Sequence, residues 1–326
     1  VPDPVPGPGE AVARVLACGA GLTIQHVKAG RTPTAFPRII GHEVTAEIAE
    51  VGKGVHSLAV GDAVTAYYYL NCGECERCRS GLEPLCQNTG GNVGRECDGG
   101  YAEYIKLPAR NFIKLPDSLD HKNHAAEIGI ICDAIATPYK VNRRTRIQPG
   151  ETVAVFGAGG GLGLHQVMLS AWAGARVIAV DTKAAKFDAC RAAGAAETVD
   201  AAAEDVVATL LALTNGDGVD IAIDYVSAKV SLEQAVGALA VKGRMVTLGG
   251  AGAVFKVDAK QLLAKELDVL GSRYVTYAEI IESLDLVARG EIWPVVSEIR
   301  PLNDAEAVHE LVERGDVIGR AALLIP

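Results

Sequence analysis

Several features that mark other classes of protein are missing from this sequence of 326 residues. No apolar run reaches the roughly 20 residues that a transmembrane helix needs, so we expect no membrane span. Positive charge is not in excess, because the formal net charge is −9, and this gives no support for nucleic-acid binding. The sequence also contains no internal repeat and no low-complexity segment. Its length allows two domains, and its 49% hydrophobic content fits a compact globular protein.

The first ten residues, VPDPVPGPGE, are too rich in proline for a helix or for the apolar core of a signal peptide. They read like the middle of a protein, so we expect an N-terminal segment to precede them. Cysteine is unevenly placed, with four of the eight cysteines between Cys72 and Cys86. In a chain of this size such clustering favours a metal site over disulfides, and therefore a reducing compartment, the cytoplasm.

One stretch, residues 151–181, organises the rest of the chain. Residues 152–156 form an apolar, β-rich run, typical of a parallel strand that is covered on both faces. Residues 164–173 place apolar side chains at helical spacing, and residues 176–180 form a second apolar strand that ends on Asp181. Between the first strand and the helix lies a cluster of glycines: Gly157, Gly159, Gly160, Gly161 and Gly163.

This order of strand, glycine turn, helix, strand and acid predicts a dinucleotide-binding βαβ unit. The best match to the glycine spacing is Gly157-x-x-Gly160-x-x-Gly163, a variant of the usual fingerprint. Glycines let the backbone approach a pyrophosphate, and the helix N-terminus offers free N–H groups to it. We predict that the three glycines and Leu162 contact the cofactor, and that Asp181 accepts hydrogen bonds from both ribose hydroxyls.

Asp181 also bears on which dinucleotide is bound. A carboxylate at this position would repel a ribose 2′-phosphate, so NAD is predicted in preference to NADP. Lys183 and Lys186 follow closely and would soften that repulsion, and we include Lys186 among the cofactor-binding residues.

The pattern of apolar and polar residues changes near residue 139. Before it lie short β-like runs with many turns, which predict an irregular antiparallel β domain: 11–17, 44–51, 62–69 and 101–107. After it, apolar strands alternate with alanine-rich helical segments, which predicts a doubly wound parallel sheet with strands at 153–157, 176–181, 220–225, 244–248 and 267–271. The last piece is predicted to hold one short helix near 304–313 and a terminal strand, and to return to the first domain.

The most specific metal signal is the run Cys72-x2-Cys75-x2-Cys78-x7-Cys86. Four thiolates in one loop can close a tetrahedral zinc site and leave no open position for a substrate. The predicted role of this zinc is therefore structural. A redox pair formed by Cys75 and Cys78 fits the four-cysteine spacing poorly.

The ordered combination of motifs resembles the zinc-containing medium-chain alcohol dehydrogenases. The motifs are GHE at 41–43, GDAV at 61–64, the four-cysteine lobe, DGGYAEY at 98–104 and the glycine-rich βαβ unit, and the resemblance covers essentially the whole chain. It implies a GroES-like catalytic domain at 1–138, to which 292–326 returns, and a Rossmann NAD-binding domain at 139–291. It also implies a small-molecule substrate and a homodimer or homotetramer.

The resemblance places a catalytic zinc on His42 and Asp133, beside Glu43. Asp133 begins the run Asp-Ala-Ile-Ala-Thr-Pro-Tyr, which matches the family's third ligand and the residues after it. The family's first ligand is the second cysteine of Ala-Cys-Gly-x-Cys-x-Thr/Ser-Asp, and here Gly21 stands in its place. Ile24 replaces the aspartate that supports the metal. Loss of such a supporting carboxylate costs about 10–100-fold in affinity or activity.

Other positions retain the residue types of the family. The resemblance assigns Thr23 to the hydroxyl that passes the substrate proton and His26 to the imidazole that relays it to solvent. Thr137 matches a position near the nicotinamide. Arg320 matches a C-terminal arginine that reaches the pyrophosphate, a suitable use of a forked cation.

Three functions therefore remain open from the sequence. The leading hypothesis is an NAD-dependent oxidoreductase acting at an alcohol or carbonyl carbon, with zinc on His42 and Asp133, and with Glu43 or water filling in for the lost cysteine. The alternative is a reductase of activated C=C bonds of the enone, quinone or enoyl-CoA type, which works without a catalytic zinc. A third possibility is a nucleotide-binding protein without catalytic activity.

Overall fold

The computed structural model describes residues 1–249 and 253–326. The chain forms two compact units, which are described separately. The first unit comprises Val1–Ala136 and Val275–Pro326, and the second comprises Thr137–Tyr274. The predicted fold class, an irregular β domain joined to a doubly wound parallel sheet, is confirmed.

The first unit is built on a sheet in which β1 is central. The strand order is β12-β13-β1-β2-β3-β5, and β4 pairs with β1 off this path. All pairs are antiparallel except β12 with β13, which is parallel. The strands are β1 (Glu10–Ala20), β2 (Val44–Val51), β3 (Ala63–Ala66), β4 (Tyr104–Pro108), β5 (Phe112–Lys114), β12 (Val296–Pro301) and β13 (Arg320–Leu324).

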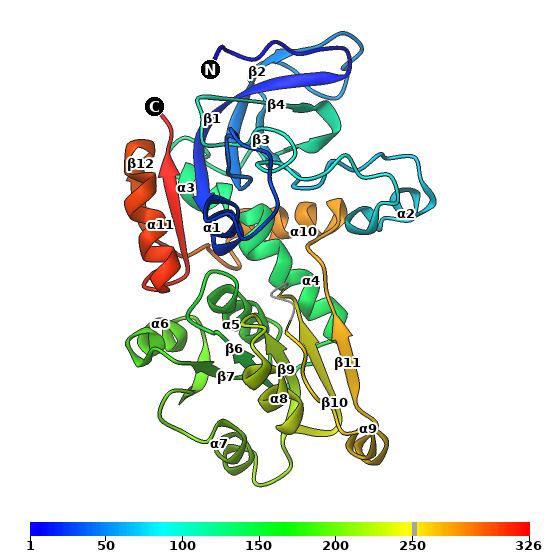
Figure 1. Cartoon of the computed structure of the whole chain (residues 1–326), viewed down its shortest axis with the longest axis vertical. Helices are drawn as coiled ribbons and strands as arrows, with labels where there is room; N and C mark the ends of the chain where they lie inside the picture. The colour runs from blue at the N-terminus through cyan, green and yellow to red at the C-terminus, as the bar shows by residue number, and fades with distance from the viewer. Residues whose placement is uncertain (250–252) are drawn as a thin grey trace. The chain divides into compact units, whose positions relative to one another are not determined.

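Helices cover this sheet and complete its core. Residues on both faces of β1 are buried, which explains why this strand reads as a nearly continuous apolar run. Helix α11 (Ala305–Arg314) packs against β12 and β13, as Figure 1 shows. The other helices of the unit are α1 (Leu22–Lys28), α2 (Glu76–Arg79), α3 (Ala125–Gly129) and α10 (Tyr277–Ala288), with 3₁₀ turns at Glu83–Leu85, Ala109–Asn111 and Leu302–Asp304 and a π turn at Ile131–Ile135.

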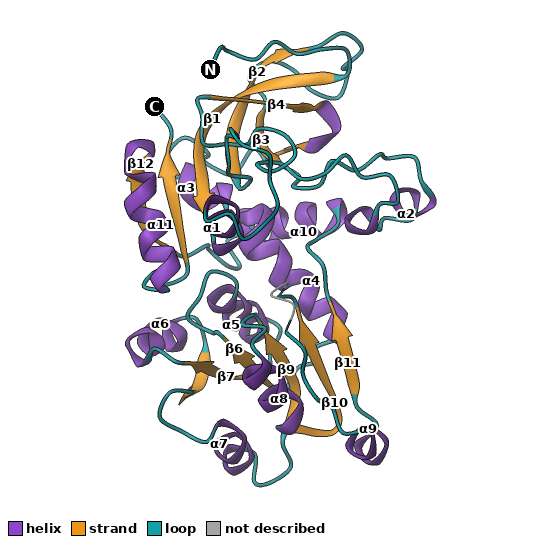
Figure 2. Cartoon of the chain, viewed as in Figure 1, coloured by secondary structure: helices purple, strands orange, loops and turns teal. Residues whose placement is uncertain are grey.

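The second unit is a six-stranded parallel sheet flanked by helices (Figure 2). Its order, β11-β10-β9-β6-β7-β8, places the switch point of the sheet between β6 and β9, where doubly wound folds bind their ligands. The strands are β6 (Thr152–Phe156), β7 (Arg176–Asp181), β8 (Ala195–Asp200), β9 (Val219–Asp224), β10 (Leu239–Thr247) and β11 (Asp268–Gly271). The helices are α4 (Ala136–Thr145), α5 (Gly163–Trp172), α6 (Phe187–Ala192), α7 (Val206–Leu213), α8 (Lys229–Gly237) and α9 (Ala259–Lys265), with a 3₁₀ turn at Ala184–Lys186.

Alternate residues of these strands face opposite sides of the sheet, and both sets are buried. Ala154 and Phe156 of β6 belong to a core cluster that contains apolar residues of α7 and α8. Val153 and Val155 are equally buried but lie outside that cluster, on the side where α5 contacts β6 and β7. This burial on two faces explains why the strands could be recognised from apolar runs alone.

Strand β8 was not predicted. Its sequence, AAETVD, contains polar residues instead of a continuous apolar run, and the strand is only partly buried. It lies at the edge of the sheet, where a strand is covered less completely than at the centre. The exposed strand β12 was missed for the same reason, whereas β5 is largely buried but has only three residues, too few to show a strand pattern. The predicted strand at 62–69 is shorter in the structure, where β3 ends at Ala66.

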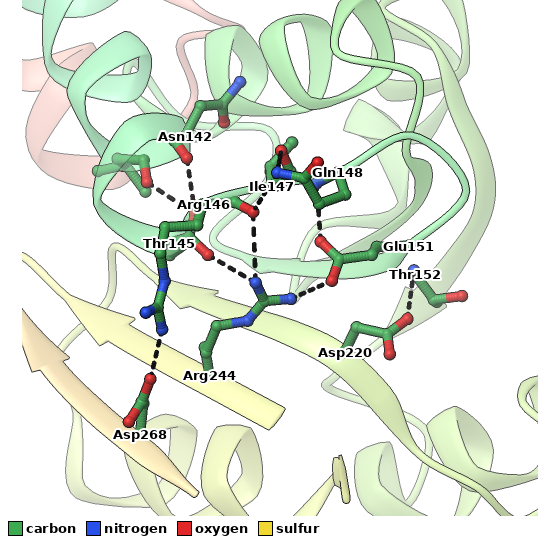
Figure 3. A network of polar contacts seen from close by, with 11 residues as sticks. Asn142, Thr145, Arg146, Ile147, Gln148, Glu151, Thr152, Asp220, Arg244 and Asp268 are labelled. Atoms are coloured by element: carbon green, nitrogen blue, oxygen red, sulfur yellow. Dashed lines mark hydrogen bonds and ion pairs between the residues drawn. The ribbon is translucent and has the colours of Figure 1, made fainter. Parts of the chain in front are cut away.

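A polar network lies at the end of the parallel sheet where the strands begin (Figure 3). The Nη1 atom of Arg244 donates to the carbonyl oxygens of Thr145, at 2.9 Å, and of Arg146, at 3.3 Å, while its Nη2 atom pairs with Glu151. Arg146 in turn pairs with Asp268 at 2.6 Å. These contacts join the end of α4 to β6, β10 and β11. The glycine turn, which begins at Gly157 after β6, lies at the opposite end of the sheet.

None of the helices in the described ranges is both long enough and apolar enough to span a lipid bilayer.

Candidate active site

Strand pairing brings the predicted reactive residues of the first unit together at one end of β1. In the β1–β2 pair, the backbone N–H of Gly19 donates to the carbonyl oxygen of Glu43 at 2.8 Å. In the β1–β13 pair, Ala20 lies opposite Ala321, so Arg320 is placed next to the end of β1. Glu43 and Arg320, which are far apart in the sequence, therefore lie close together because the strands that carry or follow them both pair with β1.

A π turn at Ile131–Ile135 supplies Asp133 to the same point. Such turns are rare and often occur at functional sites, because the wider turn redirects a side chain. Asp133 is 8% exposed, and its carboxylate faces Arg320.

Arg320 is the centre of a buried ionic cluster. Its Nε atom donates to Oε2 of Glu43 at 3.0 Å, and its Nη2 atom donates both to Oε1 of Glu43 and, at 2.7 Å, to Oδ2 of Asp133. The Nε2 atom of His42 lies 3.9 Å from each of these last two oxygens. The exposed fractions of Glu43, His42 and Arg320 are 0%, 4% and 6%. The structure thus brings the predicted metal-binding residues together, but the group at their centre is the guanidinium of Arg320.

The cluster shifts the pKa of its members in different directions. Burial raises the pKa of Glu43, and the charge of Arg320 opposes this only in part. Burial also acts to raise the pKa of Asp133, but the neighbouring His42 and the charge of Arg320 outweigh it and hold that pKa below its usual range. Burial acts to lower the pKa of Arg320, yet Glu43 and Asp133 together raise it, so the guanidinium stays charged.

Gly21 leaves the space that the guanidinium fills. A Cβ atom built on Gly21 would lie 2.7 Å from Cζ, 2.8 Å from Nη2 and 2.9 Å from Nη1 of Arg320. The backbone of Gly21 is extended, with φ −115° and ψ 173°, a conformation that any residue adopts. Glycine is therefore needed here for room and not for its conformational freedom.

The two predicted relay residues lie on α1. Thr23 is exposed and lines a small pocket together with His42 and Tyr68. His26 is half-buried on the same helix, and its Nδ1 atom accepts from Nη1 of Arg31 at 2.9 Å. Burial and the charge of Arg31 both lower the pKa of His26.

The four cysteines of the lobe lie at the corners of a tetrahedron. The Sγ atoms of Cys75 and Cys78 are 3.5 Å apart, and those of Cys72 and Cys86 are 3.6 Å apart. The separations between Cys72 and Cys78 and between Cys75 and Cys86 are both 3.9 Å. Zinc–sulfur bonds of about 2.3 Å in a tetrahedron require sulfur separations of about 3.8 Å. The lobe thus fits a structural zinc ion.

Backbone N–H groups support the thiolates of this lobe. The N–H groups of Glu74 and Cys75 donate to Sγ of Cys72 at 3.4 and 3.3 Å, and they lower the pKa of the Cys72 thiol. Thiolates are the form that binds zinc, so these two N–H groups favour the metal-binding state of Cys72.

In the second unit, the glycine turn has the geometry that close approach of a ligand requires. Gly157 ends β6 with φ +74°, a left-handed conformation that favours glycine. A Cβ atom on Gly163 would lie 2.0 Å from the carbonyl oxygen of Gly157, so only glycine fits at the start of α5. Leu162 is the N-cap residue of that helix, and Gly160 donates its N–H to the Gly157 carbonyl at 3.1 Å.

Asp181 faces this turn from the end of β7. Its Oδ2 atom accepts from the backbone N–H of Gly159 at 2.8 Å, and its Oδ1 atom accepts from the N–H of Lys183 at 3.0 Å. Lys186 is 6% exposed, and its Nζ atom donates to the Gly159 carbonyl at 3.4 Å. Thr137, which is 3% exposed, lies on α4 of the same unit. Contacts of these residues with a cofactor stay predictions.

Known proteins of one family match the chain over nearly its whole length. A family model described as an alcohol dehydrogenase GroES-like domain matches residues 7–117, and one described as a zinc-binding dehydrogenase matches residues 161–289. The chain is 35% identical over 318 residues to an alcohol dehydrogenase of Geobacillus stearothermophilus, with 97% of this chain and 91% of the relative covered. The chain belongs to the zinc-type medium-chain alcohol dehydrogenase family.

Solved structures agree with this assignment. The crystal structure of AibC is 34% identical, with a TM-score of 0.91 and coverage of 100% of this chain and 90% of that one. An NAD-dependent alcohol dehydrogenase is 30% identical, with a TM-score of 0.91 and coverage of 100% and 94%. The first unit thus contains the family's GroES-like domain, and this medium-chain dehydrogenase/reductase is an enzyme, as predicted.

The catalytic zinc of this dehydrogenase family does not fit the residues present. The family's thiolate is missing at Gly21, and the space beside Gly21 holds a guanidinium. His42, Glu43 and Asp133 offer ligand atoms within 4.8 Å of one another, but both carboxylates already bind Arg320. A zinc ion needs carboxylate oxygens at about 2.0–2.2 Å, so it would compete with Nη2 of Arg320 for the same atoms.

Several contacts of the site were not predicted. The ring of Tyr68 lies 4.3 Å from that of His42, between centroids. Arg31, which donates to His26, is itself paired with Glu313 on α11. The ion pairs of Arg320 were also not predicted. Arg31 and His26 are only five residues apart, but the other contacts join residues that only the fold brings together, and no local motif signals them.

Proposed function

We propose that this dehydrogenase transfers hydride between NAD and the carbon of an alcohol or carbonyl compound. The observation that carries the proposal is the carboxylate of Asp181 at the end of β7, held against the glycine turn through the N–H of Gly159. This arrangement suits a ribose with free hydroxyls beside a pyrophosphate at the N-terminus of α5. The alcohol dehydrogenases among the relatives support an alcohol or carbonyl as the second substrate.

The cofactor preference follows from charge. Asp181 would repel a 2′-phosphate, which favours NAD, while Lys183 and Lys186 reduce the repulsion. Gly157, Gly160 and Gly163 with Leu162 would hold the pyrophosphate. The family resemblance assigns Thr137 to the nicotinamide and Arg320 to the pyrophosphate.

The chain's own residues would handle the proton of the reaction. Bound nicotinamide supplies or accepts the hydride at its C4 atom. The hydroxyl of Thr23 would pass the proton of the substrate oxygen, and His26 would exchange it with solvent. Because an arginine only donates hydrogen bonds, the bond from Arg31 makes Nδ1 of His26 an acceptor and leaves the hydrogen of the neutral ring on Nε2.

A second candidate is the reduction of an activated C=C bond. It is favoured by the guanidinium beside Gly21, because such a reaction needs a donor for the enolate oxygen and no catalytic zinc. Hydride would then reach the β-carbon, and a proton would complete the saturated product.

Turnover of NADH and NADPH with a panel of aldehydes, ketones and enones tests both candidates. The proposal expects NADH to be consumed with aldehydes or ketones and NAD to be reduced with the matching alcohols. If NADH is consumed with enones alone, the second candidate replaces the first. Binding of NADH without turnover of any compound would indicate a protein without catalytic activity.

The remaining expectations belong to the same proposal. We expect a homodimer or homotetramer in the cytoplasm, acting on a small molecule. Sedimentation of the purified chain would distinguish the two assemblies.

A further inference from the structure

Resting on the proposed function, we propose that Arg320 takes the position that a catalytic metal ion holds elsewhere in the family. Its guanidinium binds the oxygen of a neutral carbonyl substrate, and the chain carries a single zinc ion, in the four-cysteine lobe. This replaces the metal-assisted reaction at His42 and Asp133 by one that uses a fixed organic cation.

The first argument is the identity of the atoms involved. Oε1 of Glu43 and Oδ2 of Asp133 are the carboxylate oxygens 3.9 Å from Nε2 of His42. Those same two oxygens accept from Nη2 of Arg320. One nitrogen thus occupies the point from which a metal ion would reach both carboxylates.

The second argument is steric and involves the residue that differs from the family. A side chain at Gly21 would overlap the guanidinium, since its Cβ atom alone would lie 2.7 Å from Cζ of Arg320. A cysteine at this position and the guanidinium in its present place exclude each other. The loss of the family's thiolate at Gly21 therefore leaves the room that the guanidinium occupies.

The third argument is the stability of the charge distribution. Arg320 is 6% exposed and contacts two carboxylates that are themselves buried. Moving it away would leave two buried negative charges without a partner, which is strongly unfavourable. The ion pairs therefore hold the guanidinium in place.

The remaining donor of Arg320 defines the ligand. Nε and Nη2 are used by Glu43 and Asp133, whereas Nη1 has no acceptor within residues 1–249 and 253–326 and lies beside Gly21. A charged donor in a water-poor site stabilises a developing oxyanion. The carboxyl groups of Glu43 and Asp133 beside this donor disfavour a carboxylate substrate, so the position suits a neutral carbonyl oxygen.

Metal content of the native protein is the first test, and it does not depend on turnover. Elemental analysis before any chelation should find about one zinc ion per chain, and the variant Cys78→Ser should remove it. About two ions per chain, with one of them lost in His42→Ala, would overturn the proposal.

Variants at Gly21 and Arg320 test the steric argument, because removal of the guanidinium should allow a metal ion to bind at the catalytic position. With the lobe kept in its zinc form, added Co²⁺ should give a thiolate charge-transfer band and one further metal ion in Gly21→Cys/Arg320→Ala. Gly21→Cys alone should bind none, because the guanidinium stays between the carboxylates. Equal binding by the single and double variants would show that Arg320 is not the obstacle, and the proposal would fail.

Arg320→Lys and Arg320→Gln test the donor role, with Arg300→Gln as a control at an exposed arginine of β12. We expect kcat with the carbonyl substrate to fall about 100-fold in both Arg320 variants, with the Kd for NADH unchanged. A weaker Kd for NADH with an unchanged kcat would assign Arg320 to the pyrophosphate and contradict the proposal. If no carbonyl compound is turned over at all, the proposed function fails, while the metal measurements still decide what occupies the site.

Discussion

The guanidinium of Arg320 fills the space that a side chain at Gly21 would need. Gly21 directly follows β1 and Arg320 is the first residue of β13, and the pairing of these strands sets Ala20 opposite Ala321. This dehydrogenase departs from its family at Gly21, and the close contact means that a substitution at either residue should affect the position of the other.

Gly21→Ala should destabilise the first unit. The added methyl group meets Cζ of Arg320 at 2.7 Å, so the guanidinium or α1 must shift, at a cost of about 1–3 kcal/mol in the free energy of unfolding. Urea denaturation measures this cost. Gly271→Ala is the matched control, because a Cβ atom there meets nothing within 4 Å, and that variant should be neutral or slightly more stable. Equal effects of the two variants would contradict the steric argument.

Cys78→Ser should remove the zinc ion of the four-cysteine lobe. Three thiolates cannot close the tetrahedron that the Sγ separations of 3.5 to 3.9 Å describe. Elemental analysis should find about one zinc ion less per chain, and the Tm should fall because metal binding stabilises the fold of the loop. The control is Cys97→Ser, at a cysteine outside the lobe, which should keep its zinc. Retention of full zinc content by Cys78→Ser would refute the assignment.

Arg31→Gln should raise the pKa of His26. In the native chain, burial and the charge of Arg31 lower that pKa, so the neutral ring persists to lower pH than for an ordinary histidine. Without the cation, His26 becomes protonated at higher pH. The acidic limb of the kcat/KM profile for alcohol oxidation should therefore move to higher pH, if His26 acts as the relay.

Glu313 faces the same group from α11 and must be considered in that experiment. It pairs with Arg31 and acts to raise the pKa of His26. Glu313→Gln should accordingly shift the acidic limb in the opposite direction, to lower pH. Proton titration of the His26 ring by NMR checks both variants directly. Identical profiles for all three proteins would exclude His26 from the proton pathway.

Arg244→Gln should weaken the second unit more than Asp268→Asn. Arg244 is largely buried and serves two backbone carbonyls and Glu151, so its loss leaves several acceptors unsatisfied, at a cost of about 1–3 kcal/mol. The pair between Arg146 and Asp268 is exposed, and such pairs contribute roughly 0–1 kcal/mol. Denaturant unfolding of the two variants measures the difference, and a reversed order would contradict this account of the network in Figure 3.

Asp181→Asn should weaken NADH binding and reduce the preference for NADH over NADPH. The substitution removes the charge that would bind the ribose hydroxyls and repel a 2′-phosphate, and we expect the Kd for NADH to rise about 10–100-fold. Fluorescence titration with both nucleotides gives the two affinities. Asp188→Asn, at an exposed residue of α6, is the control. An unchanged ratio of the two affinities would remove Asp181 from cofactor selection.

The sequence by itself determined the features whose residues lie close together along the chain. The four-cysteine lobe spans one loop, and the glycine turn with Asp181 spans one βαβ unit, so spacing alone predicts their geometry. Buried parallel strands were recognisable because burial on both faces leaves a continuous apolar run. Edge strands such as β8 lack that run and were not recognised.

Tertiary structure decided the chemistry of the active site. The resemblance to the family identified Gly21 as the place of a missing ligand and assigned Arg320 to the pyrophosphate, with no relation between the two residues. Their contact arises because β13 returns to pair with β1, while a π turn brings Asp133, 187 residues away, to the same guanidinium. Such a contact leaves no periodic signal, since it depends on the packing of elements from both ends of the chain and on the need of buried carboxylates for a cation.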